Sequence, residues 1–375
     1  MNVNIVSIQR IKLIDFIKKE IVLIISIALA IFSCIFSTPR LSYIDFKVLI
    51  LLFNLMIVVS AFNELKVLDS IASKILKKCT SYISVSFALV FITYAASMVV
   101  TNDVALITFV PLTIIIGKKA NFNPLKIIIF QTIAANLGSS FTPMGNPQNL
   151  FIYSFYKLGI IDFLKITFPL LLISTILLAL FISKEKNATL NINLKNINIK
   201  DRKQVIIFST LFFIILLSVL HFIDYKIVFI ITLITVSLFN KSLFSKVDYS
   251  LLLTFIGFFI FIGNISTLDT VKNFMEYILN SGKATFTYSI LISQVISNVP
   301  ATMLLSGFTT SIRELLIGVN IGGLGTLISS LASVISFKIY TNEFPEESSN
   351  YFKSFTLYNI LGLVIIIPLV YIILF

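Results

Sequence analysis

Residues 136–149 read Asn-Leu-Gly-Ser-Ser-Phe-Thr-Pro-Met-Gly-Asn-Pro-Gln-Asn, a polar, helix-breaking stretch between two apolar runs. Pro143 and Pro147 each remove a backbone donor and disfavour helical angles at the residue before them. Gly138 and Gly145 loosen the backbone further. In lipid, such a break survives only where protein or a water-filled cavity surrounds it. The stretch therefore predicts a broken membrane helix, from which secondary transporters build their sites; a proline-kinked core helix is the alternative.

The composition around this stretch is that of a polytopic membrane protein. Of the 375 residues, 57% are hydrophobic and only 12% are charged, with a mean hydropathy of +1.01, which excludes an ordinary soluble domain. The apolar run 21–37 has no small-residue cleavage site after it, so we expect a first span and not a cleaved signal. The net charge of +12 lies in short basic loops, which set membrane orientation, and we expect no nucleic-acid partner.

The apolar runs divide the chain into two halves joined by a polar linker. Basic residues before the first run predict a cytoplasmic N-terminus, and the linker, residues 184–204, holds six basic and two acidic residues, which predicts a cytoplasmic segment. In the N-terminal half (1–183) we expect spans at 21–37 and 46–62, a flat surface helix at 64–79, a hairpin at 82–117, a broken span at 125–153 and a span at 163–183. In the C-terminal half (205–375) we expect spans at 205–223, 227–239 and 249–266, a surface helix at 268–279, a hairpin at 286–318, a broken span at 319–340, a cytoplasmic loop at 341–356 that contains acidic residues 343–347, and a span at 357–375.

The run 82–117 is about 36 residues long, and Thr101-Asn102-Asp103 interrupts its middle. Basic residues flank both ends, so a single crossing would leave one basic cluster outside. A re-entrant hairpin that turns at Asn102 keeps both clusters in the cytoplasm, and we favour it. Two full spans joined by a tight turn have the same sidedness and remain the alternative.

Short motifs of the first half recur in the second. Thr101–Ala105 resembles Ser297–Ala301, and Asn136–Ser139 resembles Asn320–Gly323. In each half the hairpin follows an amphipathic helix with a Leu-Asp pair and precedes a broken span. We expect each element of the second half to cross the membrane in the direction opposite to its counterpart in the first half. The sequence thus predicts an all-α inverted repeat with two re-entrant hairpins and two broken helices, whose site lies at the membrane midplane.

Four motifs resemble the ion transporter superfamily, which includes arsenite permeases, sodium/proton antiporter-type permeases, citrate transporters and divalent-anion/sodium symporters. They are Thr101–Ala105, Gly145–Asn149, Val247–Leu252 and Ser297–Ala301, and the resemblance covers about residues 40 to 375. It implies that hairpin tips and broken helices enclose substrate and coupling ions, and that a homodimer with an elevator-like motion forms. The dicarboxylate members have Ser-Asn-Thr at both tips, whereas this chain has Thr-Asn-Asp and Ser-Asn-Val. The implied site residues are Thr101, Asn102, Asp103, Asn136, Gly138, Thr142, Gly145, Asn146, Asn149, Ser297, Asn298, Asn320, Gly322 and Thr326.

Asp103 is the only acidic residue in the middle of one of these apolar stretches, and an ionisable residue there is a functional-site hypothesis by default. It could bind a cation directly, or burial could keep it protonated so that it carries a proton. The alternative is that Asp103 caps the helix that follows the tip. Because sodium takes oxygen ligands, a sodium site is predicted at Asn102, Asp103, Asn146 and Asn298.

These residues favour an ion-coupled secondary transporter, or permease, of a small inorganic or organic anion or a neutral oxyacid such as arsenite. We expect it in the cytoplasmic membrane of a prokaryote, with sodium or a proton as coupling ion and no covalent cofactor. No Lys or Arg lies at mid-depth, so a sodium/proton antiporter that uses Asp103 is the nearest alternative. A membrane-embedded enzyme is less favoured, because His221 is the only histidine and Cys34 and Cys79 have no metal or redox spacing. A channel is third, since paired helix breaks favour alternating access.

Overall fold

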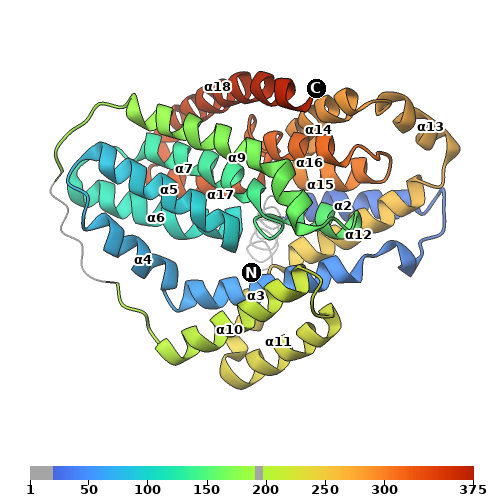
Figure 1. The fold of residues 1–375 in the computed structure, drawn as a ribbon, viewed down its shortest axis with the longest axis horizontal. Coiled ribbons are helices and arrows are strands. Elements are labelled where there is room, and N and C mark those ends of the chain that lie inside the picture. The colour runs from blue at the N-terminus through green and yellow to red at the C-terminus, as the bar shows by residue number, and fades with distance from the viewer. Residues whose placement is uncertain (1–19, 191–196) are drawn as a thin grey trace, which may run out of the picture.

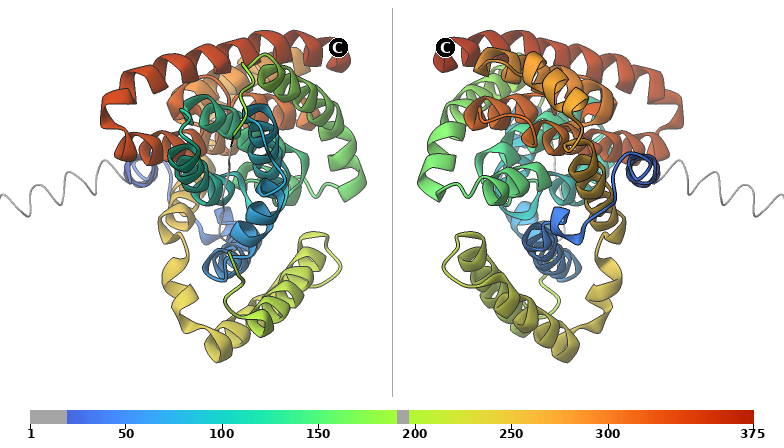
Figure 2. Two further views of the ribbon diagram at one scale, coloured as in Figure 1. Left: turned by 90° about the vertical axis from the view of Figure 1, so that its left-hand side faces the viewer. Right: turned by 90° about the vertical axis from the view of Figure 1, so that its right-hand side faces the viewer.

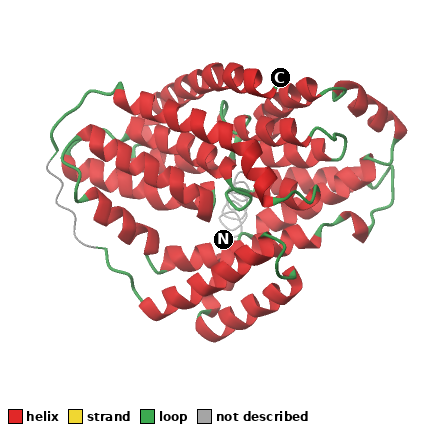
Figure 3. Ribbon diagram, viewed as in Figure 1, coloured by secondary structure: helices red, strands yellow, loops and turns green. Residues whose placement is uncertain are grey.

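The computed structural model describes residues 20–190 and 197–375 (Figure 1). Within these ranges the regular elements are helices, and one isolated bridge, between Ser81 and Thr189, is the sole strand-like pairing (Figure 3). Five of the helices are long and apolar enough to cross a membrane by length and composition. The predicted all-α polytopic membrane fold is therefore confirmed.

The helix bounds follow the predicted elements closely. In the first half they are α2 (Ile21–Ser33), α3 (Phe46–Glu64), α4 (Val67–Leu76), α5 (Tyr82–Val100), α6 (Asn102–Ala120), α7 (Leu125–Gly138), α8 (Pro147–Phe155) and α9 (Ile160–Ser183). In the second half they are α10 (Arg202–Val219), α11 (Tyr225–Phe239), α12 (Tyr249–Ile265), α13 (Asp269–Ile278), α14 (Gly282–Ile296), α15 (Asn298–Ser306), α16 (Ile312–Ile321), α17 (Leu331–Glu343) and α18 (Ser348–Leu374).

Two boundaries differ from those expected by more than four residues. The second hairpin ends at Ser306, and the next helix begins at Ile312, so residues 312–318 belong to the broken span and not to the hairpin. Polar residues turn the chain between them, where the Ser311 N–H donates to Thr309 Oγ1 at 3.1 Å. The expected loop 341–356 is also shorter, because α18 already begins at Ser348 and its first turns carry the polar residues.

The two surface helices lie towards opposite ends of the molecule. In Figure 1, α4 and hairpin α5–α6 lie towards one end of the long axis, and α13 and hairpin α14–α15 towards the other. The chain bends by 101° between α12 and α13, as the amphipathic pattern of α13 predicts. The membrane-embedded elements thus lie between two amphipathic helices.

Charged contacts gather at the end that carries α4. Lys118 pairs with Glu343, and Lys126 pairs with Glu185 at 2.9 Å. The linker is bound to the same end, because the Leu190 N–H donates to the Thr80 carbonyl at 2.9 Å. The acidic residues near position 343 therefore share an end with basic loops, as expected, while the assignment of that end to the cytoplasm stays a prediction.

The buried apolar side chains form two cores. One surrounds hairpin α5–α6 together with α7, α9, α17 and α18, and the other surrounds α3 together with α8, α10, α11 and α12. Helix α2 packs on α12, and reciprocally α11 packs on α3; Figure 2 shows α10 and α11 as a separate pair at one edge. The elements from α2 to α9 and from α11 to α18 follow one order, and their inverted relation stays a prediction.

Candidate functional site

Both hairpins turn through the same rare backbone conformation. Thr101 has φ 77° and ψ 152°, and Ser297 has φ 74° and ψ 155°. A residue with a side chain pays about 1–3 kcal/mol for this region, so the surroundings must impose it, and such strain gathers at functional sites. The pair of tips is therefore a candidate site on backbone geometry alone.

The first tip is held against the first helix break. The Asn102 N–H donates to the Gly145 carbonyl at 3.1 Å, and the Asn102 side-chain amide donates to Asn136 Oδ1 at 3.3 Å. Asn102 is only 4% exposed. A turn between two full spans would reach the surface, so the burial of this tip supports the re-entrant hairpin.

The second tip lies against the second break. Ser297 Oγ donates to the Ser329 carbonyl at 3.4 Å. The Asn298 side chain lies so close to Gly323 that a Cβ atom there would stand 2.9 Å from Asn298 Nδ2. The two tips are therefore seated in the same manner, each on the broken helix of its own half.

The predicted helix break between α7 and α8 is confirmed, and side chains satisfy its free backbone groups. A short 3-10 turn, Ser139–Phe141, follows α7, and Asn146 caps α8 by accepting from the Asn149 N–H at 2.9 Å. Asn149 Nδ2 lies 3.0–3.1 Å from the carbonyls of Ser139, Ser140 and Thr142. Thr142 Oγ1 in turn donates to the Met98 carbonyl, which ties the break to α5.

Asparagine side chains join the two breaks to each other. Asn146 Nδ2 donates to Asn320 Oδ1 at 3.1 Å, and Asn320 Nδ2 donates to Asn149 Oδ1 at 2.7 Å. Asn136 crosses between the halves as well, because its amide donates to the Gly323 carbonyl and Ser333 Oγ while its Oδ1 accepts from Ser330 Oγ. Several residues assigned to ligand binding thus hold the protein together.

The predicted glycines serve close packing. A Cβ atom on Gly138 would stand 2.4 Å from the Tyr94 carbonyl oxygen, and one on Gly322 would stand 2.7 Å from Ser293 Cβ. Thr326, another predicted site residue, is exposed, and its backbone N–H donates to Gln294 Oε1 at 3.0 Å. None of these three lines the cavity described below.

We expect Gly145→Ala to damage the first break. The added Cβ would stand 2.1 Å from the Ser139 carbonyl oxygen, a backbone atom that cannot swing away, so the free energy of unfolding should fall by about 2 kcal/mol or more. Unfolding of the purified protein would measure this. Gly362→Ala in α18 is the matched control, because its nearest contact would be 3.6 Å; equal losses in both variants would contradict the prediction.

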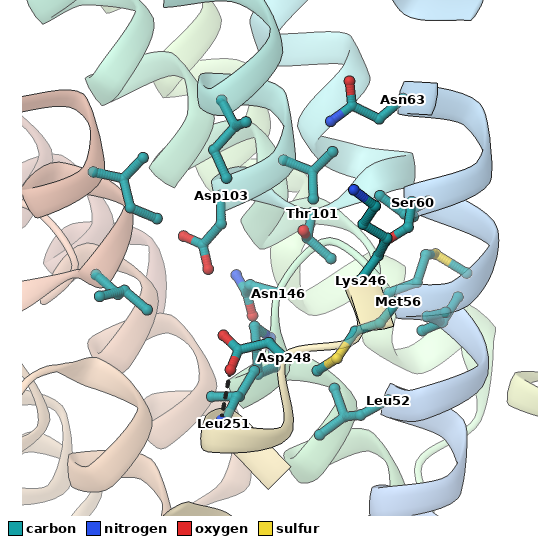
Figure 4. Close-up of a pocket in the computed structure, with 18 of the residues that line it drawn as sticks. Leu52, Met56, Ser60, Asn63, Thr101, Asp103, Asn146, Lys246, Asp248 and Leu251 are labelled. Atoms are coloured by element: carbon teal, nitrogen blue, oxygen red, sulfur yellow. Dashed lines mark hydrogen bonds between the residues drawn. The ribbon is translucent and has the colours of Figure 1, made fainter. Parts of the chain in front are cut away.

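A cavity of about 510 Å³ extends from the α4 end of the protein to the first tip. Of the predicted residues, Thr101, Asp103 and Asn146 line it, as Figure 4 shows. Asp103 Oδ1 is buried and has no hydrogen-bond partner among the described residues, and no side chain caps α6. The capping role considered for Asp103 is therefore absent, and its carboxylate is available to a ligand.

A second carboxylate lines the same cavity from a distant part of the chain. Asp248 caps α12 by accepting from the Leu251 N–H at 2.9 Å, and Asn146 lies between the two carboxylates in Figure 4. The sequence marked this stretch only as a motif, because an aspartate before a helix is an ordinary cap. The other polar or charged lining residues that sequence reasoning missed are Ser60, Asn63, Glu64, Lys66, Lys200 and Lys246.

The predicted sodium ligands are divided by the fold. Asp103 and Asn146 line the cavity together. Asn102 Oδ1 accepts from the Asp103 N–H at 3.0 Å, and Asn298 belongs to the second tip. Asp248 and Glu64 are further carboxylates that line this cavity beside Asp103.

The sequence is similar to a transporter family profile and to several membrane proteins. The citrate transporter family profile matches residues 11–314. An uncharacterised transporter of Methanocaldococcus jannaschii is 38% identical over 79% of this chain and 81% of its own length. The inner membrane protein YbiR of Escherichia coli K12 is 27% identical over 85% of this chain and 87% of its own length. A putative transporter arsB of Dictyostelium discoideum is 32% identical over 40% of this chain and 28% of its own length.

Proposed function

The chain belongs to the citrate transporter family and is a multi-pass membrane transporter, and from this premise we propose an ion-coupled carrier of a small anion or oxyacid. It works by alternating access, in the cytoplasmic membrane of a prokaryote, with the N-terminus in the cytoplasm. The observation that carries the proposal is the cavity that leads from one face to the unpartnered carboxylate of Asp103, beside the first tip and the first break.

The cavity offers ligands for a cation and for an anion together. Asp103, Asp248 and the Asn146 side chain supply the oxygen atoms that a hard cation such as sodium prefers. Helices α6 and α8 both begin at this inner region, and helix N-termini favour anions. An anion next to two carboxylates needs a cation between them, which is the physical basis of coupling. The coupling ion is sodium or a proton.

The two halves act as inverted repeats in this proposal. The cores around hairpin α5–α6 and around α3 meet along the cavity, since α3 and α6 both line it. Relative movement of these two bodies would change which face reaches the site. We also propose the homodimer that the superfamily resemblance implies.

Sodium/proton antiport is the second candidate, and the pair of carboxylates favours it. Asp103 and Asp248 line the cavity, and Glu64 lines it as well. Among the described residues, the lysines that line it are Lys66 at the start of α4, Lys200 in the linker and Lys246 before α12. A site of this kind can exchange cations without an anion.

Gradient-driven uptake into proteoliposomes tests the proposal. Labelled sulfate, phosphate, citrate, succinate and arsenite are each offered with an inward sodium or proton gradient. We expect saturable uphill uptake of at least one of them that collapses when the gradient is removed. Sodium-driven proton movement without uptake of any anion would replace the proposal by the antiporter, and flux that does not saturate would replace it by a channel.

A further inference from the structure

A second cavity, of about 430 Å³, lies near α13, at the end opposite to the first cavity. It is bounded by the segment before α3, by α12, by α8 and by α15. Its lining includes Ser266, close to α13, whereas the lining of the first cavity includes Lys66, next to α4. The two cavities therefore include residues next to α4 and α13, helices that lie towards opposite ends of the long axis in Figure 1.

The two cavities are lined by equivalent positions of the two halves. Three residues of α12 and Ser266, which directly follows that helix, line the second cavity, and each of these four lies at one constant offset along the chain from one of the seven α3 residues that line the first. The same offset relates the two aspartates that cap these helices, Asp45 and Asp248, and the residues two positions before them, Tyr43 and Lys246. The equivalent residues in the regions of α3 and α12 are Met56 and Phe259, Val59 and Ile262, Ser60 and Gly263, and Asn63 and Ser266.

Equivalent positions on the two hairpins differ in the exposed fraction of their side chains. Ile107 on the first hairpin is 44% exposed, and Met303, at the same distance from the second tip, is 1% exposed. The first cavity reaches Thr101 and Asp103, whereas the second ends at Met303 and is lined by no residue of the second tip. The second cavity thus stops short of the second tip, whereas the first cavity reaches the first tip.

Tyr43 is the side chain that closes the second cavity against α12. A Cβ atom on Gly263 would stand 2.2 Å from Tyr43 Cγ, so the ring seats directly on the glycine backbone. The counterpart of Gly263 in the first cavity is Ser60, and the counterpart of Tyr43 is Lys246. A small residue is therefore needed only where the aromatic ring packs.

The second cavity has the electrostatics of a cation site. Asp45 is the sole charged residue among the described residues that line it, and it keeps its capping bond from the Val48 N–H at 3.1 Å. Lys47, two residues further along the chain, interacts electrostatically with Asp45 but is not among the described residues that line the cavity. A cavity lined by a carboxylate and by no basic side chain attracts a hard cation and repels an anion.

We propose that this second cavity is the access site for the coupling cation on the opposite membrane face, with Asp45 as its carboxylate and Tyr43, seated on Gly263, as its closed gate. The inference rests on the proposed cation coupling. When the gate opens, the Met303 region becomes accessible from that face, and the Ile107 region closes on the other.

Thiol labelling from each face tests the gate. The background is Cys34→Ser with Cys79→Ser, and the reporters are Met303→Cys and Ile107→Cys, labelled with a membrane-impermeant thiol reagent in the reconstituted protein. Tyr43→Ala should raise the labelling rate at Met303→Cys at least tenfold and lower that at Ile107→Cys several-fold. Tyr43→Phe is the matched control with the ring retained, and Gly263→Val, which displaces the ring, should act like Tyr43→Ala.

Two results would overturn the gate. One is a Met303→Cys rate that neither Tyr43→Ala nor Gly263→Val changes, and the other is a rise at both reporters together, which indicates local loosening. The labelling uses no substrate, so a protein that fails every anion uptake assay can still show reciprocal labelling. Failure of the proposed function and failure of the gate are thus distinguished.

A comparison of the labelling rate in sodium chloride with that in choline chloride tests whether sodium binds in the second cavity. Sodium on the Met303 side should slow labelling of the gate-open Tyr43→Ala protein at least threefold. Asp45→Asn, which keeps a capping oxygen and removes the charge, should abolish this protection. Protection that persists in Asp45→Asn, or no protection in the parent, would overturn the role of Asp45.

Discussion

Asp103→Asn is expected to lower cation-driven uptake about 100-fold or more. The asparagine has the same shape, so the tip keeps its backbone contacts, but the carboxylate that faces the cavity without a partner is lost. A hundredfold loss corresponds to about 2.7 kcal/mol, a plausible value for one charged ligand of a cation in a partly enclosed site. The initial rate of uptake in proteoliposomes under a fixed gradient measures it.

The stability of this variant separates a functional loss from misfolding. Removing a buried charge without a partner should leave the unfolding midpoint unchanged or raise it. Asp248→Asn is the matched control, because its asparagine keeps the cap on α12; the smaller loss expected there is about tenfold. If the Asp103→Asn protein retains more than a tenth of the parent's initial uptake rate, the assignment of Asp103 as a ligand of the coupling ion is wrong.

Asn149→Leu is expected to destabilise the protein by about 3 kcal/mol or more. The change removes the donor to three carbonyl groups of the first break and the acceptor of one Asn320 amide bond. The Thr142 carbonyl keeps the Gly145 N–H and the Asn320 amide keeps the Leu316 carbonyl, so the main loss falls on the carbonyls of Ser139 and Ser140; each buried polar group without a partner costs about 1–3 kcal/mol. The midpoint of thermal unfolding in detergent should fall by roughly 5 °C.

Asn63→Leu provides the comparison for Asn149→Leu. It is the same chemical change at a partly exposed position that lines the first cavity, where no hydrogen bond is lost within the described structure. We expect a change in unfolding free energy below about 0.5 kcal/mol. Similar losses in both variants would show that the network between the breaks contributes little to stability.

The sequence predicted the helix breaks and the tips because their causes are local. Pro143 and Pro147 disfavour a continuous helix, so the span breaks within the expected stretch, and α8 begins at Pro147 with Asn146 as its cap. Thr101-Asn102-Asp103 likewise interrupts an apolar run by composition alone. The end of the second hairpin was missed although residues 306–314 read Ser-Gly-Phe-Thr-Thr-Ser-Ile-Arg-Glu, a mostly polar segment that signals the short turn before Ile312.

The site could be predicted only in part, because sequence does not tell which polar side chains face a cavity and which face each other. Asn136, Asn149 and Asn320 are engaged in mutual contacts across the breaks. Asp248 and Lys246 reach the cavity from about 145 positions further along the chain than Asp103, a relation that only tertiary packing creates.

The bonds of Asn136 also bear on how the protein is made. Its partner Ser330 lies 194 residues further along the chain. At a synthesis rate of about 5–20 residues per second, roughly 10–40 seconds pass before the ribosome supplies that partner. During this interval the first half sits in the bilayer with amides that have nothing to bind. The insertion machinery or water must shield them, so the nascent first half is the stage at which this protein is most exposed to quality-control proteolysis.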